Sequence, residues 1–129
     1  MSTAPRLLII SHDVIGTRMA GPGIRAWETA RVLSQQPVTL IAPQPIDRDP
    51  EGFAIGSYTW GDAASLAVWL ADADVVFANG FVLRAHPELA SFPRPLALDL
   101  YDPVFLEALE AERGLAEPER AARHAIQRD

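Results

Sequence analysis

The sequence predicts an α/β fold in which an open parallel sheet is flanked by helices. Short runs of strand-forming apolar residues alternate along the chain with segments of helical periodicity, the pattern of a parallel sheet with crossover helices. The first strand, expected at residues 6–10 (RLLII), is continuously apolar after its arginine, which is typical of a strand buried on both faces. The length of 129 residues corresponds to one domain.

The remaining elements follow in order, with recognisable residues at their ends. The first helix is expected at 22–36, with Pro22 in its first turn, where a missing N–H costs nothing. Its apolar stripe consists of Ala26, Trp27, Ala30 and Leu33. A second helix is expected at 62–73, with Asp62 as its N-cap. Further strands are predicted at 37–43, 53–60, 74–79 and 95–102, a short helix or turn at 80–95, and two final helices at 103–114 and 117–129.

The composition excludes several classes of protein and site. The chain has no cysteine, which excludes disulfides, thiolate zinc sites and a cysteine nucleophile. Its formal net charge of −6 argues against a nucleic-acid partner. No apolar run reaches the roughly 20 residues of a membrane span or the length of a secretory signal, which favours a cytoplasmic protein. The polar final segment has no helix stop signal, so we expect the chain to be one part of a longer protein.

The candidate site lies in the loops that follow the strands, because open α/β sheets bind ligands at the carboxyl ends of their strands. His12 and Asp13 are too few for a structural metal site, and turn or capping roles are predicted for them instead. Asp99 and Asp102 are either a pair of carboxylates or, for Asp102, the cap of the helix at 103. The loops also contain Ser11, Asn79, Gly80 and Tyr101.

The other histidines and the tryptophans are assigned to the surface or the core. His86 and His124 lie among polar residues and are expected at the surface. Trp27 and Trp69 lie on apolar helical stripes and are expected in the core, whereas Trp60, at a strand end, fits either environment.

Residues 21–26 (GPGIRA) have the letters of a dinucleotide-binding fingerprint but lack its context. That fingerprint follows its strand directly and needs an acid at the end of the second strand. Here about ten residues separate Ile10 from Gly21, and the second predicted strand ends in Ala42 and Pro43, so the nicotinamide interpretation fails. Two interpretations remain: an ordinary helix start, or one whose free N–H groups and dipole, together with Arg25, bind an anion.

Three segments of the chain resemble the N-terminal domain of bacterial family 4 glycosyltransferases, which are retaining enzymes of the GT-B fold that use nucleotide-sugar donors. These segments are residues 6–43, 74–80 (DVVFANG) and 95–110 (PLALDLYDPVFLEALE). The most specific part is GPGIRAWE, at 21–28, directly after the loop that follows the first strand. The resemblance implies a Rossmann-like, acceptor-side domain spanning residues 1–129, which is inactive alone because the donor-binding domain lies outside this chain.

The resemblance also implies roles for individual residues. The donor phosphates or the acceptor would meet the glycine-rich loop and its neighbours, namely Gly21, Pro22, Gly23, Ile24, Arg25, Asp13, Asn79 and Gly80. Tyr101 stands about where many relatives have a histidine near the reacting sugar, so Tyr101 and Asp102 are the predicted catalytic residues.

The partners implied by the resemblance are small molecules. They are a nucleotide-sugar donor, bound mainly by the other domain, and a sugar, lipid or small-molecule acceptor. No cofactor and no metal are implied, and the complete protein could associate peripherally with a membrane.

Two alternatives stay open beside the transferase. One is a noncatalytic, flavodoxin-like ligand-binding or regulatory α/β domain, in which Asp13 and Asp99 are ordinary polar residues at strand ends. The other is a sugar-nucleotide epimerase or a related Rossmann enzyme, which the position of the glycines disfavours.

Overall fold

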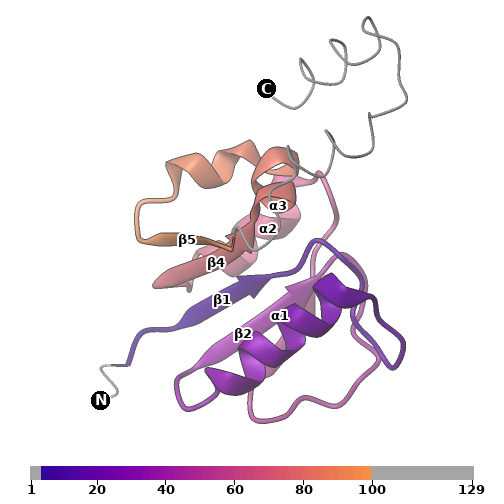
Figure 1. Ribbon diagram of the computed structural model, residues 1–129. Helices are drawn as coiled ribbons and strands as arrows, with labels where there is room; N and C mark the ends of the chain where they lie inside the picture. Colours follow the sequence, from indigo (N-terminus) through magenta and orange to yellow (C-terminus); the bar gives the residue numbers. More distant parts are fainter. Residues whose placement is uncertain (1–3, 100–129) are drawn as a thin grey trace, which may run out of the picture. The chain divides into compact units, whose positions relative to one another are not determined.

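The structure, a computed structural model, describes residues 4–99 and contains one five-stranded parallel sheet (Figure 1). The strands are β1 (Leu7–Ile10), β2 (Val38–Ala42), β3 (Ala54–Ser57), β4 (Val75–Asn79) and β5 (Leu96–Asp99), in the spatial order β3-β2-β1-β4-β5. This confirms the predicted α/β fold with a parallel sheet. The order is that of the dinucleotide-binding sheet, 3-2-1-4-5, and differs from the flavodoxin order, 2-1-3-4-5.

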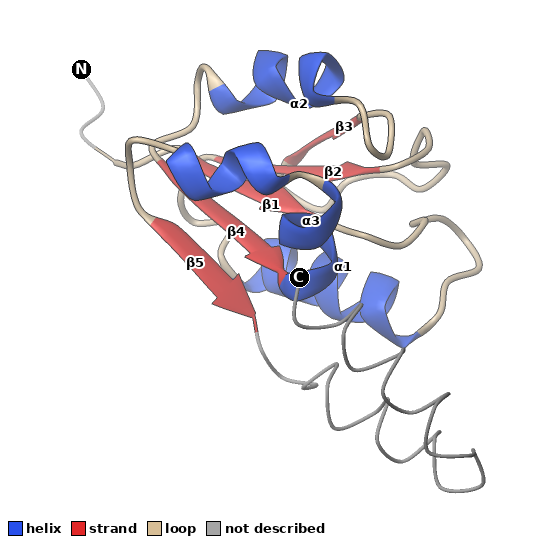
Figure 2. Cartoon of the chain, turned by 90° about the horizontal axis from the view of Figure 1, so that it is seen from above, coloured by secondary structure: helices blue, strands red, loops and turns tan. Residues whose placement is uncertain are grey.

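Helices lie on both faces of the sheet (Figure 2). One face is covered by α1 (Gly21–Val32), which packs against β1 and β2. The opposite face is covered by α2 (Ala63–Leu70) and α3 (Gly80–Ala85), the latter followed by the 3₁₀ helix η1 (Pro87–Ser91). Each helix therefore shields a different part of the same sheet, as in other doubly wound domains.

Two apolar cores result from this arrangement, one on each face. Ile9 and Leu40 point to the α1 side and pack with Trp27, which is 1% exposed. Leu8 and Ile41, one residue away along the same strands, belong to the core under α2 and α3. Burial on both faces explains why the first two strands are continuous apolar runs rather than alternating ones.

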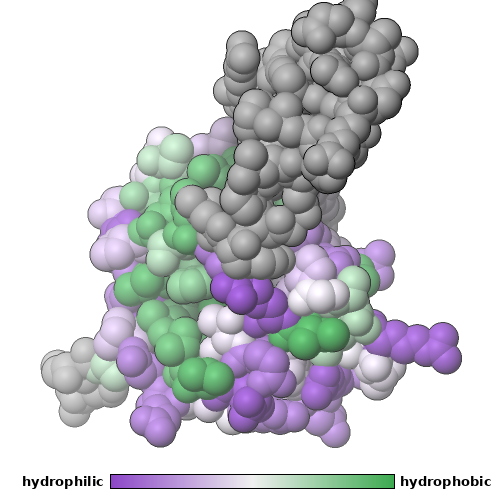
Figure 3. Space-filling model, viewed as in Figure 1, coloured by the Kyte–Doolittle hydropathy of each residue, from purple (hydrophilic) through white to green (hydrophobic). Residues whose placement is uncertain are grey.

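Apolar side chains also gather beside α1, over β4 and β5 (Figure 3). Ile24 and Val32, on α1, are 48% and 68% exposed, and Phe77 of β4 lies near them. Together with Gly21 and Leu33 they line an open groove along the helix.

Several predicted elements are confirmed but are shorter than expected. The first helix ends at Val32, where residues 33–36 form turns, and the third strand covers only Ala54–Ser57. Asp62 caps α2 as predicted, its Oδ1 accepting from Ala64 N at 3.1 Å. The helices expected at 103–114 and 117–129 lie outside the described residues. Within residues 4–99, no helix is both long and apolar enough to cross a membrane.

Tyr58 links β3 to the end of β1, and its hydroxyl is expected to contribute measurably to stability. It is 4% exposed, burial raises the pKa of its phenol, and its Oη donates to Ser11 O at 2.6 Å. The substitution Tyr58→Phe should lower the free energy of unfolding by about 1 kcal/mol, because the buried carbonyl of Ser11 loses this donor. Urea denaturation followed by circular dichroism measures the change, and an unaltered midpoint would contradict it.

Candidate functional site

The candidate site is the carboxyl edge of the sheet, where the parallel strands β1, β4 and β5 all end. The connections diverge between β1 and β4, because β1 leads to α1 on one face and β4 leads to α3 on the other (Figure 2). Ligands of doubly wound domains bind at such a switch point. The structure places Asp13 in the loop after β1, the segment Gly21–Arg25 at the start of α1, Asn79 at the end of β4 and Gly80 at the start of α3.

The loop between β1 and α1 is held by its own hydrogen bonds and by a neighbouring loop. Ser11 Oγ donates to Asp13 O at 2.7 Å and accepts from Asp13 N at 3.2 Å. Asp13 Oδ1 accepts from the next backbone N–H, which confirms the turn role predicted for this residue. Ile15 anchors the middle of the loop in the core, and Thr17 N donates to Asp47 Oδ1 at 3.0 Å. The loop is therefore fixed before any ligand binds.

The start of α1 has no side-chain cap. Its N-cap is Ala20, whereas α2 and α3 are capped by Asp62 and Asn79. Pro22 has no N–H, so the backbone donors in this first turn are those of the two glycines and of Ile24, which already donates to Ala20 O. The helix thus begins with backbone donors that no side chain satisfies.

The two glycines at this start play different structural roles. A Cβ on Gly23 would lie 2.9 Å from Val14 O and 3.1 Å from Met19 Cβ, so the loop packs where a side chain would be. A Cβ on Gly21 would have no atom within 4 Å. Gly23 is therefore required for packing, while Gly21 leaves open space in front of the helix.

Arg25 is paired with Asp99 in the structure. Its Nε donates to Asp99 Oδ2 at 2.6 Å and its Nη2 to Oδ1 at 2.9 Å, a bidentate pair that joins the first turn of α1 to the end of β5. The Asp99 side chain is only 17% exposed. The positive charge that the sequence analysis expected Arg25 to offer an anion is thus offset by a carboxylate. Tyr101 and Asp102 lie outside the described residues, so their catalytic roles remain predictions.

A second contact, between His12 and Asn79, crosses the switch point. Asn79 Oδ1 accepts from Val82 N at 3.1 Å and thereby caps α3, which directs its amide nitrogen to His12 Nδ1. The His12 ring also stacks on Phe81, with centroids 4.8 Å apart and planes at 29°. Burial lowers the pKa of His12, and the carboxylate of Asp13 opposes this only partly. Near pH 7 the lowered pKa therefore favours the neutral ring, which the hydrogen bond from Asn79 to Nδ1 also requires.

The lowered pKa of His12 predicts that the free energy of unfolding depends on pH. Because its pKa is lower in the folded than in the unfolded chain, the unfolded chain binds the extra proton first as pH falls. The contribution of His12 to stability is thus complete above its ordinary pKa of about 6.5 and is lost as pH falls below that value. Urea denaturation of the wild type and His12→Gln at pH 7.5 and 5.5 measures it, and the difference between the two proteins should shrink at pH 5.5. A difference that grows on acidification would contradict the neutral ring.

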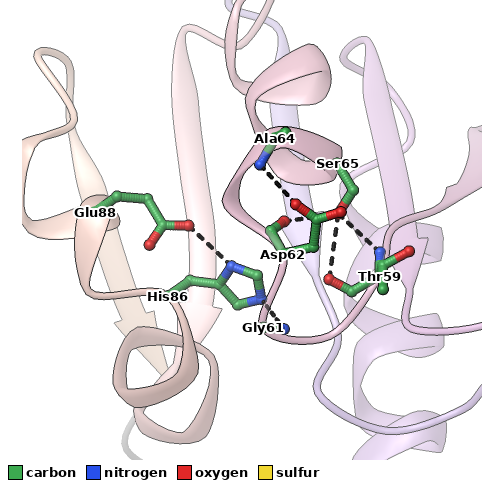
Figure 4. Close-up of polar contacts among 7 residues, drawn as sticks. All are labelled: Thr59, Gly61, Asp62, Ala64, Ser65, His86 and Glu88. Atoms are coloured by element: carbon green, nitrogen blue, oxygen red, sulfur yellow. Dashed lines mark hydrogen bonds and ion pairs between the residues drawn. The ribbon is translucent and has the colours of Figure 1, made fainter.

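The prediction that His86 is exposed is wrong, because its side chain is 0% exposed. Figure 4 shows its ring between Glu88 and the loop that contains Gly61. Its Nε2 accepts from Gly61 N at 3.0 Å and its Nδ1 donates to Glu88 Oε1 at 2.9 Å. The rings of Tyr58 and Trp60 meet it edge-on, with centroids 5.5 and 5.8 Å away. The loop before α2 covers His86, and the polar sequence around it does not reveal this. Trp60 itself is 44% exposed, which settles its ambiguous assignment.

The remaining sequence assignments are placed as follows. Trp27 is buried, and Trp69 is partly buried against the other core, with its Nε1 donating to Ser57 O at 2.9 Å. His124 lies outside the described residues. Within residues 4–99, no three histidine, aspartate or glutamate side chains are grouped so that they could hold a metal ion.

Fold and site together define a doubly wound α/β domain with a candidate ligand site at the switch point between β1 and β4. The sequence matches no family model, and no curated protein is similar to it. Among solved structures, the chain is similar to the DNA/pantothenate metabolism flavoprotein from Streptococcus pneumoniae, at 16% identity and a TM-score of 0.38. The match covers 78% of this chain and 57% of the flavoprotein chain, so this chain spans less than two thirds of that protein.

Proposed function

We propose that the chain is the acceptor-side domain of a retaining glycosyltransferase, which transfers a sugar from a nucleotide-sugar donor to an acceptor. The observation that carries the proposal is the position of the glycine-rich start of α1 at the switch point of a 3-2-1-4-5 sheet. The segment in which the resemblance to family 4 glycosyltransferases is most specific, GPGIRAWE, is therefore at the edge where doubly wound domains bind ligands.

The start of α1 has the chemistry that a departing nucleoside diphosphate requires. Negative charge develops on the diphosphate as the sugar leaves, and fixed N–H donors stabilise such charge. Because Ile24 N already donates to Ala20 O and Gly23 is buried, the uncapped first turn offers the N–H of Gly21 and the positive end of the helix dipole, and the open space at Gly21 admits an oxygen atom close to the backbone. Since Asp99 offsets the charge of Arg25, the helix backbone is the main source of this stabilisation. Tyr101 and Asp102 keep their proposed contacts with the reacting sugar or the acceptor.

A noncatalytic ligand-binding or regulatory α/β domain is the second candidate. It is favoured by the way in which polar side chains at the carboxyl edge bond to one another. Ser11 contacts Asp13, His12 contacts Asn79, and Arg25 contacts Asp99. Such mutual pairing is what a preformed binding site needs, and it leaves no activated nucleophile within residues 4–99.

A sugar-transfer assay separates the two candidates. The proposal predicts no turnover by the 129-residue chain alone, and transfer with retained anomeric configuration when the chain precedes the donor-binding domain of a family 4 glycosyltransferase. Labelled nucleotide sugars and a panel of sugar and lipid acceptors provide the readout. A binding module predicts ligand binding by the chain and no turnover by either protein. Turnover by the chain alone would contradict the division of labour proposed here.

A further inference from the structure

His12 has one ring nitrogen that is not used within the protein. Its Nδ1 accepts from the amide of Asn79, and this direction is fixed because the Asn79 oxygen already caps α3 through Val82 N. The neutral imidazole must therefore carry its proton on Nε2. That atom has no hydrogen-bond partner among the residues the structure describes, and His12 as a whole is only partly buried.

We propose that His12 is a ligand-binding residue whose Nε2–H donates a hydrogen bond to an oxygen atom of a small molecule at the switch point between β1 and β4. The inference rests on the proposed function and deepens it, because it adds a named side-chain donor to the backbone donors of α1. The oxygen belongs either to a sugar hydroxyl or to a phosphate, since both accept hydrogen bonds from a neutral imidazole.

The surroundings of His12 suit a ligand-binding residue better than a residue that only links two loops. The ring is held on one edge by Asn79 and on one face by Phe81, so its free donor is oriented before a ligand arrives and little entropy is lost on binding. Phe81 is itself 37% exposed and offers an apolar surface next to the donor. Gly21 and Gly80, at the helix starts on the two sides of the switch point, both leave open space where a Cβ would project.

The same geometry rules out a general-base role for His12 in this arrangement. A base needs a nitrogen lone pair facing the proton that it removes. The lone pair of Nδ1 is occupied by Asn79, and Nε2 already carries a proton. His12 therefore binds and orients an oxygen atom and does not deprotonate a hydroxyl.

The test is a titration of the ¹⁵N-labelled 129-residue chain, monitored through the imidazole nitrogens by long-range ¹H–¹⁵N spectra. The free protein should show the Nε2–H tautomer of His12. Uridine diphosphate and glucose are added in separate titrations, and a saturable shift of the His12 nitrogen signals is expected in at least one. Because uridine diphosphate also carries ribose hydroxyls, a shift with it identifies a phosphate oxygen only when inorganic pyrophosphate produces the same shift, and a shift with glucose identifies a hydroxyl. The Nδ1–H tautomer, or no shift with either compound, would overturn the inference.

Two variants test the donor separately from the fold. His12→Phe keeps a ring that can stack on Phe81 but removes the donor, and should weaken binding of the effective compound by about tenfold. Asn79→Asp keeps an oxygen to cap α3 but turns a carboxylate toward Nδ1, which raises the pKa of His12. At alkaline pH, where the ring of this variant is neutral, its proton lies on Nδ1, and binding should weaken similarly. Asp62→Asn, at the N-cap of α2, is the matched control and should leave binding unchanged.

The outcome is separable from that of the proposed function. If His12→Phe binds as tightly as the wild type while the two-domain protein transfers sugar, the role of His12 is wrong and the transferase stands. If the variants lose binding while the two-domain protein transfers nothing, His12 binds a ligand in a protein of another function.

Discussion

Replacing His86 with alanine is expected to lower the free energy of unfolding by about 3 to 4 kcal/mol, from a lost ring and two lost hydrogen bonds. The imidazole is fully buried and joins Gly61 N, before α2, to the Glu88 carboxylate, at the start of η1. Its removal leaves a cavity beneath Trp60. It also leaves the backbone N–H of Gly61 without an acceptor, in a region that water enters only if the loop moves. Urea denaturation followed by circular dichroism and tryptophan fluorescence measures the loss.

Glu88→Gln is the matched control for this prediction. An amide oxygen can still accept the hydrogen bond from His86 Nδ1, so we expect a change below about 1 kcal/mol. Equal losses in the two variants would mean that the charge of Glu88, rather than the buried ring, stabilises this junction. An alanine variant as stable as the wild type would show that His86 is not buried.

Within residues 4–99, local signals were sufficient to predict the order and type of the elements. The continuous apolar runs at Leu7–Ile10 and Val38–Ala42 are buried on both faces, and Pro22 and Asp62 stand at the helix starts where they were expected. The ends were less accurate because they depend on packing between distant segments. The first helix ends at Val32, since the chain must turn there to reach β2 beside β1.

The edge of the sheet that forms the candidate site was predicted from the sequence, but the contacts between its side chains were not. Because carboxyl ends of parallel strands share one edge, the loops could be brought together from the sequence alone. The pairing of Arg25 with Asp99, 74 residues apart, and of His12 with Asn79, 67 residues apart, has no local signature. The burial of His86 has none either: α3 ends at Ala85 and η1 begins at Pro87, so His86 lies between two helices and shares no single helical face with the buried Val82 and Leu89.

Gly23→Ala is expected to lower the free energy of unfolding by about 1 to 3 kcal/mol, the range for overpacking a close contact. The new methyl group would lie 2.9 Å from the backbone oxygen of Val14, which cannot move without shifting the loop between β1 and α1. Gly21→Ala is the matched control, with the same change two residues earlier and no atom within 4 Å of the new group. It should leave stability unchanged or raise it by up to about 1 kcal/mol, because the unfolded chain loses conformational freedom. Urea denaturation of both variants measures the contrast, and equal effects would contradict it.

The same pair of variants separates the structural and the ligand-binding interpretations of the glycine-rich segment. If the start of α1 binds a diphosphate, the alanine methyl group of the Gly21 variant occupies the space through which an oxygen atom reaches the backbone donors. A stable Gly21→Ala protein with weakened binding of uridine diphosphate would then show that this glycine serves the ligand, while Gly23 serves the fold. If Gly21→Ala changes neither stability nor binding, the segment is an ordinary helix start, and the function must be sought at His12 and Asn79 on the other side of the same edge.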